Sequence, residues 1–186
     1  ALAAPYIIEE VKKAEKEGFS AVSLDCAMDT VVRAAREAVR IPVTSAGESS
    51  YLLAFGLCRK FSVVTVLRST AEQIKENISK YGFGDRIASV RMANIPVLDL
   101  KDERKAFKAI LSEAKVAIEK DGAEAIVLGC TGMSSLTKKL QNELKVPVID
   151  PAVSSLKLAE IYVNMELTTS GIAYEVPSGG KNTLKY

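Results

Sequence analysis

Hydrophobic and polar positions change their period repeatedly along this chain. Apolar residues recur at helical spacing in seven segments, which predicts helices at residues 5–17, 29–39, 48–57, 71–81, 102–120, 134–144 and 152–164. Between them lie short apolar runs, which predict buried parallel strands at residues 21–24, 41–44, 61–67, 87–92, 125–128 and 146–149. This alternation indicates an α/β fold, with parallel sheets covered by helices. Residues 168–186 show little periodicity and are expected to be extended or irregular.

One stretch of this pattern occurs twice. Residues 18–43 read GFSAVSLDCAMDTVVRAAREAVRIPV, and residues 122–148 read GAEAIVLGCTGMSSLTKKLQNELKVPV. In each copy a cysteine, Cys26 or Cys130, follows the opening glycine by eight residues. A Ser-Ser-x-x-Leu-Ala segment begins seven residues after the proline of each copy. The repeat therefore predicts two similar half-molecules, each of which offers one thiol.

The repeat also predicts the domain organisation. We expect two pseudo-symmetric domains, each with a doubly wound parallel sheet, and an active site in the cleft between them. Residues 1–58 together with 152–186 are assigned to the first domain, and residues 59–151 to the second. The second copy is preceded by a predicted strand, helix and strand over residues 61–92, whereas the first copy begins almost at Ala1. We therefore expect the counterpart of that unit in an upstream segment of roughly forty residues or more.

Composition excludes several classes of protein. Of the 186 residues, 48% are hydrophobic and 26% are charged, which is typical of a soluble globular protein with a buried core. The net charge is +2 and no basic stripe with aromatics occurs, so we expect no nucleic acid partner. No apolar run approaches ~18 residues, so we expect no membrane partner. Three cysteines without disulfide or zinc spacing are typical of a reducing compartment, and a cytoplasmic location is predicted.

The chain contains no histidine, which limits its chemistry. Ser-His-Asp and Cys-His catalysis and most zinc chemistry are excluded. The repeated cysteines, Cys26 and Cys130, each follow the carboxyl end of a predicted strand, where open α/β sheets bind ligands. A helix begins soon after each, and its amides and dipole are expected to lower the pKa of the thiol toward neutrality. Two such thiols in one pocket can remove and return a proton. Cys58 has no counterpart in the repeat and is predicted to be structural.

Residues beside the thiols are candidates for substrate binding. The amides of Ala27, Thr131 and Gly132, and the Thr131 hydroxyl, are placed to hold a carbonyl oxygen next to the reacting carbon. Charge develops on that oxygen when the α-proton leaves, so donors there stabilise the enolate-like state. Thr65 lies at the end of the strand predicted over residues 61–67, where a ligand is also within reach.

Two acidic residues and one loop have structural alternatives. Asp29 is predicted to cap the helix at residues 29–39. Asp25 is unusual on an apolar strand, and it raises the pKa of Cys26 only if the two side chains meet. The segment TSAGESS, with Gly47 at its centre, either caps a helix or binds an anionic group at the helix N-terminus. The sequence leaves both interpretations of this segment open.

The residues around the thiols resemble the aspartate/glutamate racemase superfamily, and the hydantoin racemases within it most. The resemblance is carried by the two-cysteine repeat, by GCTGM at residues 129–133 and by CAMDTVVRAARE at residues 26–37. The last segment is similar to the family pattern Cys-Phe-Gly-Asp-Pro-Gly-Leu-x-Ala-Ala-Arg-Glu. RIPVTSAGESS, RKFSVVT, VPVIDPA and TSGIAYEVP extend the likeness over nearly the whole chain. The chain departs from the pattern by placing Ala27 and Met28 at Phe-Gly, and Thr30 and Val31 at Pro-Gly.

This resemblance implies a cofactor-independent racemase, with a small-molecule substrate and no metal or pyridoxal phosphate. Cys26 and Cys130 would face opposite sides of the substrate Cα, one as thiolate and the other as thiol. The preferred substrates are those with an acidified α-proton, such as 5-substituted hydantoins. A homo-oligomeric assembly is left open.

Other functions also remain open. Aspartate or glutamate racemisation and maleate cis–trans isomerisation both fit two cysteines, whereas arylmalonate decarboxylases use a single one. If neither thiol is reactive, a small-ligand binding module or a thiol redox protein becomes the better interpretation.

Overall fold

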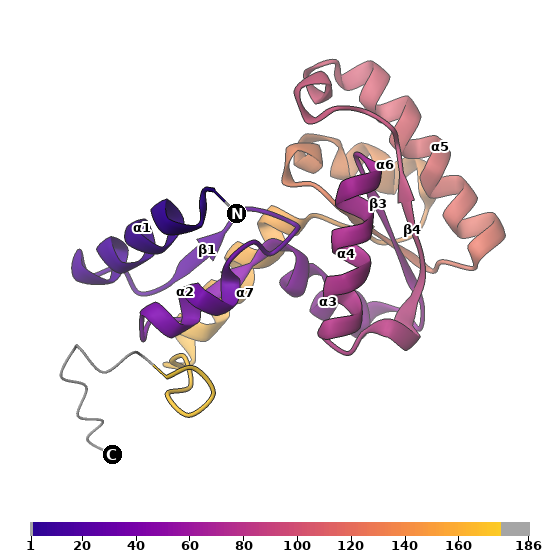
Figure 1. Ribbon diagram of the computed structural model, residues 1–186. Coiled ribbons are helices and arrows are strands. Elements are labelled where there is room, and N and C mark those ends of the chain that lie inside the picture. Colours follow the sequence, from indigo (N-terminus) through magenta and orange to yellow (C-terminus); the bar gives the residue numbers. More distant parts are fainter. Residues whose placement is uncertain (1, 176–186) are drawn as a thin grey trace.

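The computed structural model of the chain describes residues 2–175, which form two lobes built on separate parallel sheets (Figure 1). Ala1 and residues 176–186, which belong to the segment predicted to be extended or irregular, lie outside the described residues. The fold class is confirmed as α/β with parallel sheets covered by helices. No helix among residues 2–175 has both the length and the apolar character needed to cross a membrane.

The described elements follow the predicted order closely. The strands are β1 (Val22–Leu24), β2 (Val43–Ser45), β3 (Phe61–Thr65), β4 (Ile87–Met92), β5 (Ala125–Leu128) and β6 (Val148–Ile149). The α-helices are α1 (Ala4–Lys16), α2 (Val32–Ala38), α3 (Ala46–Leu57), α4 (Arg68–Lys80), α5 (Glu103–Asp121), α6 (Thr137–Leu144) and α7 (Pro151–Asn164). Short 3-10 helices occupy Gly84–Arg86 (η1), Val97–Lys101 (η2) and Thr131–Leu136 (η3).

The larger lobe contains a four-stranded parallel sheet in the order β4-β3-β5-β6. β3 and β5 are buried on both faces and are mainly apolar, as is typical of parallel strands, although β3 also buries Ser62 and Thr65. Tyr51 and Ala54 of α3 and Ile74 and Ile78 of α4 pack on one face, whereas α5 and α6 pack on the other. Helices thus cover both faces of this sheet in a three-layer arrangement, and one of them, α3, comes from outside residues 59–151.

The smaller lobe is built on β1 and β2, which pair in parallel. A core of Val11, Val32, Ala35, Val39 and Val43 joins α1 and α2 to this sheet. The other side of the sheet is contacted by α7, through a hydrogen-bonded group of hydroxyls. The Ser23 hydroxyl donates to Ser155 Oγ at 2.7 Å, and the Thr44 hydroxyl donates to the Ser155 carbonyl at 3.0 Å.

Helices α3 and α7 connect the two lobes. α3 directly follows β2 of the smaller sheet, yet its side chains pack on the four-stranded sheet. α7 directly follows β6 of the four-stranded sheet, yet it packs on β1 and β2 and along α3. The two helices thus repeat the same crossing in opposite directions, as the internal repeat would require. The domain boundaries proposed from the sequence stay a prediction, and α3 contacts both of the proposed domains.

The structure differs from the predicted elements mainly at their ends. α4 begins at Arg68, three residues before the first apolar position of its buried face. The helix predicted over residues 134–144 is divided into η3 and α6, and α6 ends at Leu144, before Lys145, which adopts a left-handed φ of 58°. Between the strand predicted at residues 87–92 and the helix predicted at residues 102–120, the chain forms η2. The two glycines that open the repeat, Gly18 and Gly122, both follow a helix and have φ of 84° and 75°, which favours glycine at that point.

Candidate functional site

Cys26 lies in the loop of residues 25–31, directly after β1. The loop folds tightly: the Cys26 amide donates to the Leu24 carbonyl at 3.0 Å, and the Asp29 amide donates to the Cys26 carbonyl at 2.9 Å. The thiol is partly exposed, and Thr30 Oγ1 lies 3.9 Å from its Sγ atom. We refer to residues 25–31 as the Cys26 loop.

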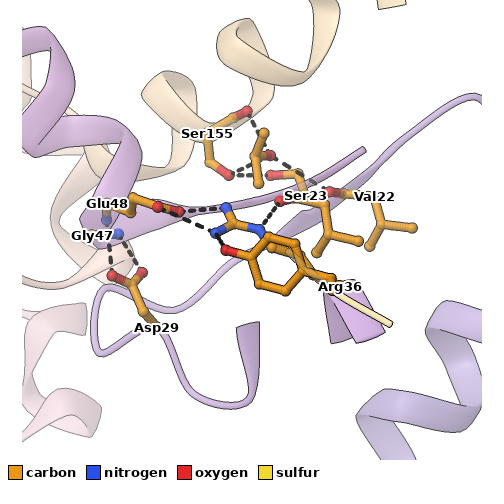
Figure 2. A network of polar contacts seen from close by, with 10 residues as sticks. Val22, Ser23, Asp29, Arg36, Gly47, Glu48 and Ser155 are labelled. Carbon is orange, nitrogen blue, oxygen red and sulfur yellow. Dashed lines mark hydrogen bonds and ion pairs between the residues drawn. The ribbon is translucent and has the colours of Figure 1, made fainter. Parts of the chain in front are cut away.

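Asp29 fixes this loop to the first turn of α3, and not to the helix that follows it in sequence. One carboxylate oxygen accepts the Gly47 amide and the other accepts the Glu48 amide, both at 2.8 Å (Figure 2). The prediction that Asp29 caps the helix at residues 29–39 is therefore wrong. α2 starts only at Val32, after Val31 in the left-handed region, and has no side-chain cap. The anion at the TSAGESS turn is the chain's own Asp29.

The Asp29 carboxyl is buried and has an unusual pKa. Burial raises its pKa from 3.8 to about 6, although the Gly47 and Glu48 amides and the neighbouring Tyr81 act to lower it. The same helix end also holds an ion pair, in which the Glu48 carboxylate accepts hydrogen bonds from both Nη atoms of Arg36 (Figure 2). The Nε atom of Arg36 donates to the Val43 carbonyl at 3.0 Å. The first turn of α3 is thus a densely bonded anchor for the Cys26 loop.

Cys130 lies two residues after β5, at the corresponding end of the four-stranded sheet. The turn before it is tightly packed, since a Cβ on Gly129 would lie 2.6 Å from Thr65 Cβ. The Thr65 hydroxyl donates to the Gly129 carbonyl at 3.0 Å. Only glycine fits this approach, so β3 fixes the backbone that presents the second thiol.

The electrostatic surroundings of Cys130 connect the two cysteines. Burial raises the pKa of the Cys130 thiol, the Gly132 amide lowers it, and the charges of Cys26 and Asp25 raise it. The expected lowering of the Cys130 pKa is therefore wrong, because burial and neighbouring negative charge outweigh one amide. The same influence of Cys26 and Asp25 indicates that the Cys26 loop lies within electrostatic reach of Cys130. Each cysteine follows the carboxyl end of a parallel strand, β1 or β5, and the pairing of the two thiols in one site stays a prediction.

The Cys130 segment is also fixed to a helix N-terminus. Asp150 caps α7 by accepting the amides of Ala152 at 2.9 Å and Val153 at 3.2 Å. The same carboxylate accepts the Ser134 hydroxyl of η3 at 2.8 Å. Each cysteine segment is therefore linked through one aspartate to the N-terminus of one crossing helix, Asp29 with α3 and Asp150 with α7.

The predicted binding residues are distributed unevenly around the thiols. Thr131 is partly exposed beside Cys130, and Gly132 is exposed with its amide directed at the Cys130 sulfur. Ala27 and Thr65 are buried, with exposed fractions of 5% and 0%. Thr65 therefore lies behind the Cys130 turn and contacts the Gly129 backbone. Cys58, predicted to be structural, donates its thiol proton to the Ala54 carbonyl at 3.2 Å.

Two residues that support the loops were not identified from the sequence. Asn77 of α4 donates from Nδ2 to the Met28 carbonyl at 2.7 Å, and its exposed fraction is 8%. Its signal in the sequence is a polar residue on the apolar face marked by Ile74 and Ile78. Asp150 was also missed, although an aspartate followed by Pro151 at a helix start is a recognisable cap.

Cavities and metal ligands add two further observations. A cavity of about 650 Å³ lies behind the Cys26 loop, lined by residues that include Asp29, Val31, Asn77 and Tyr81. A larger cavity of about 850 Å³, between α3 and α7, is lined by neither repeated cysteine. Within residues 2–175, no three His, Cys, Asp or Glu side chains are grouped to hold a metal ion.

Comparison with known proteins places this arrangement in a family context. A sequence model described as Asp/Glu/Hydantoin racemase matches residues 1–159. A hydantoin racemase of Pseudomonas sp. (strain NS671) is 40% identical over 178 residues, which are 95% of this chain and 72% of the relative.

Solved structures agree with the sequence comparison. An allantoin racemase from Klebsiella pneumoniae is 31% identical with a TM-score of 0.92, over 98% of this chain and 76% of that protein. An allantoin racemase from Pseudomonas fluorescens is 33% identical with a TM-score of 0.91, over 98% of this chain and 78% of that protein.

Proposed function

Because the chain belongs to the Asp/Glu/hydantoin racemase family, we propose that it inverts a hydantoin-type stereocentre with Cys26 and Cys130 and without a cofactor. As a member of this family it is an isomerase that acts on a small molecule. The observation that carries the two-thiol assignment is the matched position of the two cysteines, one in each half of the repeat, at the carboxyl ends of β1 and β5, where α/β folds bind ligands. The charge of Cys26 also acts to raise the pKa of Cys130.

The proposed reaction requires one thiolate and one thiol. The thiolate removes the proton from the stereocentre, and the electron pair of the C–H bond moves into the adjacent carbonyl to give an enolate. The opposite thiol then donates its proton to the other face of the carbon and becomes the thiolate. The product has the inverted configuration and the two sulfurs have exchanged protonation states, so the reverse reaction uses the same groups.

The electrostatics of the pair suit this division of roles. A negative charge on Cys26 raises the pKa of Cys130, so ionisation of one thiol opposes ionisation of the other. Loss of both protons is therefore disfavoured, and two-base transfer needs one sulfur to keep its proton. When Cys130 becomes the thiolate in turn, the nearby Gly132 amide stabilises its charge.

The binding roles follow from where each residue lies. Thr131, partly exposed beside Cys130, is proposed to donate to the carbonyl oxygen that becomes the enolate. The Gly132 amide is proposed to donate a hydrogen bond to the Cys130 sulfur. Ala27 is proposed to contribute its backbone to the wall of the site. Thr65 is proposed to act through the Gly129 carbonyl, and so to position Cys130 without touching the substrate.

The substrate class follows from acidity and charge. In hydantoins, including allantoin, the stereocentre carbon is next to a ring carbonyl, so its proton is far more acidic than that of a free amino acid. Asp25 is exposed, and its charge reaches Cys130. A carboxylate there disfavours substrates with two carboxylates, such as aspartate, glutamate or maleate, and permits a neutral ring.

A substrate panel tests this function. Each enantiomer of allantoin and of several 5-substituted hydantoins, together with L-aspartate, L-glutamate and maleate, is incubated with EDTA-treated protein and followed by chiral chromatography. Racemisation of at least one hydantoin, with no activity on the dicarboxylates, is expected. Activity on the dicarboxylates alone would assign the site to amino-acid racemisation or cis–trans isomerisation. Activity that EDTA abolishes would contradict a cofactor-independent reaction.

A further inference from the structure

Asn77 joins the two lobes at the Cys26 loop. It lies on α4, which belongs to the lobe that carries Cys130, and its Nδ2 atom donates to the Met28 carbonyl at 2.7 Å. Met28 is only two residues from Cys26. The bond therefore connects the backbone that presents one thiol to the lobe that presents the other.

The position of Asn77 in α4 indicates that this bond has a purpose beyond helix formation. The residue lies on the buried face of the helix between Ile74 and Ile78, and its exposed fraction is 8%. Asparagine is a poor helix former, and a buried amide is unfavourable unless it is hydrogen-bonded. Its Oδ1 atom accepts a hydrogen bond from Gln73 Nε2 at 3.4 Å, which directs the Nδ2 group toward Met28.

The Cys26 loop needs this contact, because packing alone does not hold it from every side. On one side the loop is bonded to α3 through Asp29. On the other side it borders the cavity of about 650 Å³ that Asp29, Asn77 and Tyr81 help to line. A loop beside open space can shift unless a directional bond fixes it. Tyr81, one turn after Asn77, adds a second contact from α4, because its hydroxyl lies beside the Asp29 carboxyl.

We propose that Asn77 is a positioning residue that holds Cys26 at its working separation from Cys130 by tying the Met28 carbonyl to α4. This inference rests on the proposed two-thiol function. Cys130 needs no equivalent tie across the lobes, because Thr65 and Gly129 fix its turn within the four-stranded sheet. Asn77 touches no reacting atom, so its removal changes the placement of a thiol and not the chemistry of either sulfur.

The test compares kinetics with loop mobility. Asn77→Asp keeps the side-chain volume but removes the donor, and Asn77→Ala removes the whole group. Both are expected to lower kcat in both directions by between about 10-fold and 100-fold, because a small misplacement of a catalytic group is costly. KM is expected to change less than kcat, because the substrate contacts remain. Amide hydrogen exchange in residues 26–31 is expected to accelerate in the same variants.

Two further variants serve as controls. Asn142→Ala makes the same chemical change at an exposed position of α6 and should match the wild type in kinetics and exchange. Gln73→Ala removes only the contact that orients Asn77, from an exposed position, and should lower kcat by a smaller factor. If the Asn77 variants do not fold, Gln73→Ala decides the question.

The outcomes separate this inference from the proposed function. The positioning role is overturned if the Asn77 variants keep both the wild-type kcat and the wild-type exchange rate of residues 26–31. If only Gln73→Ala folds, the same two results in that variant overturn it. If the wild type racemises no hydantoin, the proposed function fails, whereas faster exchange in the variants still supports the tie between the lobes.

Discussion

The first turn of α3 approaches the Cys26 loop so closely that a Cβ on Gly47 would lie 2.6 Å from the carbonyl oxygen of Ala27. It would also lie 2.6 Å from an oxygen of the Asp29 carboxylate. This contact explains why glycine occupies a position inside a helix, where its flexibility is unfavourable. The absence of a side chain at Gly47 leaves the space that the loop carrying Cys26 occupies.

Gly47→Ala is therefore expected to destabilise the protein, although alanine is the better helix former. The new methyl group displaces the Cys26 loop, and we expect a loss of about 1–3 kcal/mol in unfolding free energy together with lower activity. Gly56→Ala is the matched control, since it lies in the same helix with no atom within 4 Å of its ideal Cβ. That change should stabilise by about 0.5–1 kcal/mol. Urea unfolding of both variants measures the contrast, and equal effects would refute the close-approach explanation.

Thr65→Val is expected to weaken the protein without weakening substrate binding. The change keeps the shape of the side chain but removes the donor to the buried Gly129 carbonyl, which costs about 1–3 kcal/mol. Because the Cys130 turn loses its support, kcat should fall while KM stays near its wild-type value. A large rise in KM with unchanged kcat would instead mean that the Thr65 hydroxyl binds substrate directly.

Val31→Gly is expected to be neutral or stabilising, unlike most glycine substitutions. Val31 has a φ of 61°, and a left-handed conformation costs a side-chain-bearing residue about 1–2 kcal/mol. The strain energy that is relieved is larger than the entropic cost of ordering a more flexible residue. The unfolding free energy should therefore rise by up to about 1 kcal/mol. Ala34→Gly, on the exposed side of α2, should lose about 1 kcal/mol and is the control. The two variants losing the same stability in thermal unfolding would show that Val31 is unstrained.

Asp29→Asn is expected to change the pH dependence of stability. The Asp29 pKa is about 6 in the folded protein and 3.8 ordinarily, so the folded state holds this proton to higher pH. Stability from this group is complete below about pH 4 and is lost as the pH rises through about 6, a change of about 3 kcal/mol. The unfolding free energy of the wild type should therefore fall by about 3 kcal/mol relative to that of Asp29→Asn between pH 4 and pH 7, because only the wild type loses a proton from the buried group. A constant difference in unfolding free energy from pH 4 to 7 would contradict the raised pKa.

The sequence predicts the fold well because its signals are periodic. β4 and β5 occur at the predicted residues, and the repeat anticipates the matched crossings of α3 and α7. The support of the site is less predictable, because it depends on contacts between distant residues. Asp29 resembles a local helix cap in sequence, yet it caps a helix that starts 17 residues later. Likewise, the pKa of Cys130 depends on burial and on charges from the other lobe, neither of which is visible in its sequence neighbours.

The most direct test of the two-thiol mechanism is proton exchange with single cysteine variants. Each enantiomer of an active hydantoin is incubated in D₂O with wild type, Cys26→Ser, Cys130→Ser and Cys58→Ser, and both chirality and deuterium content are measured. The wild type and Cys58→Ser should racemise equally and place deuterium at the stereocentre of the product. Cys26→Ser and Cys130→Ser should each lose racemisation by at least about 100-fold, since each removes one of two proton-transfer groups. Wild-type racemisation by either of these two variants would contradict the account.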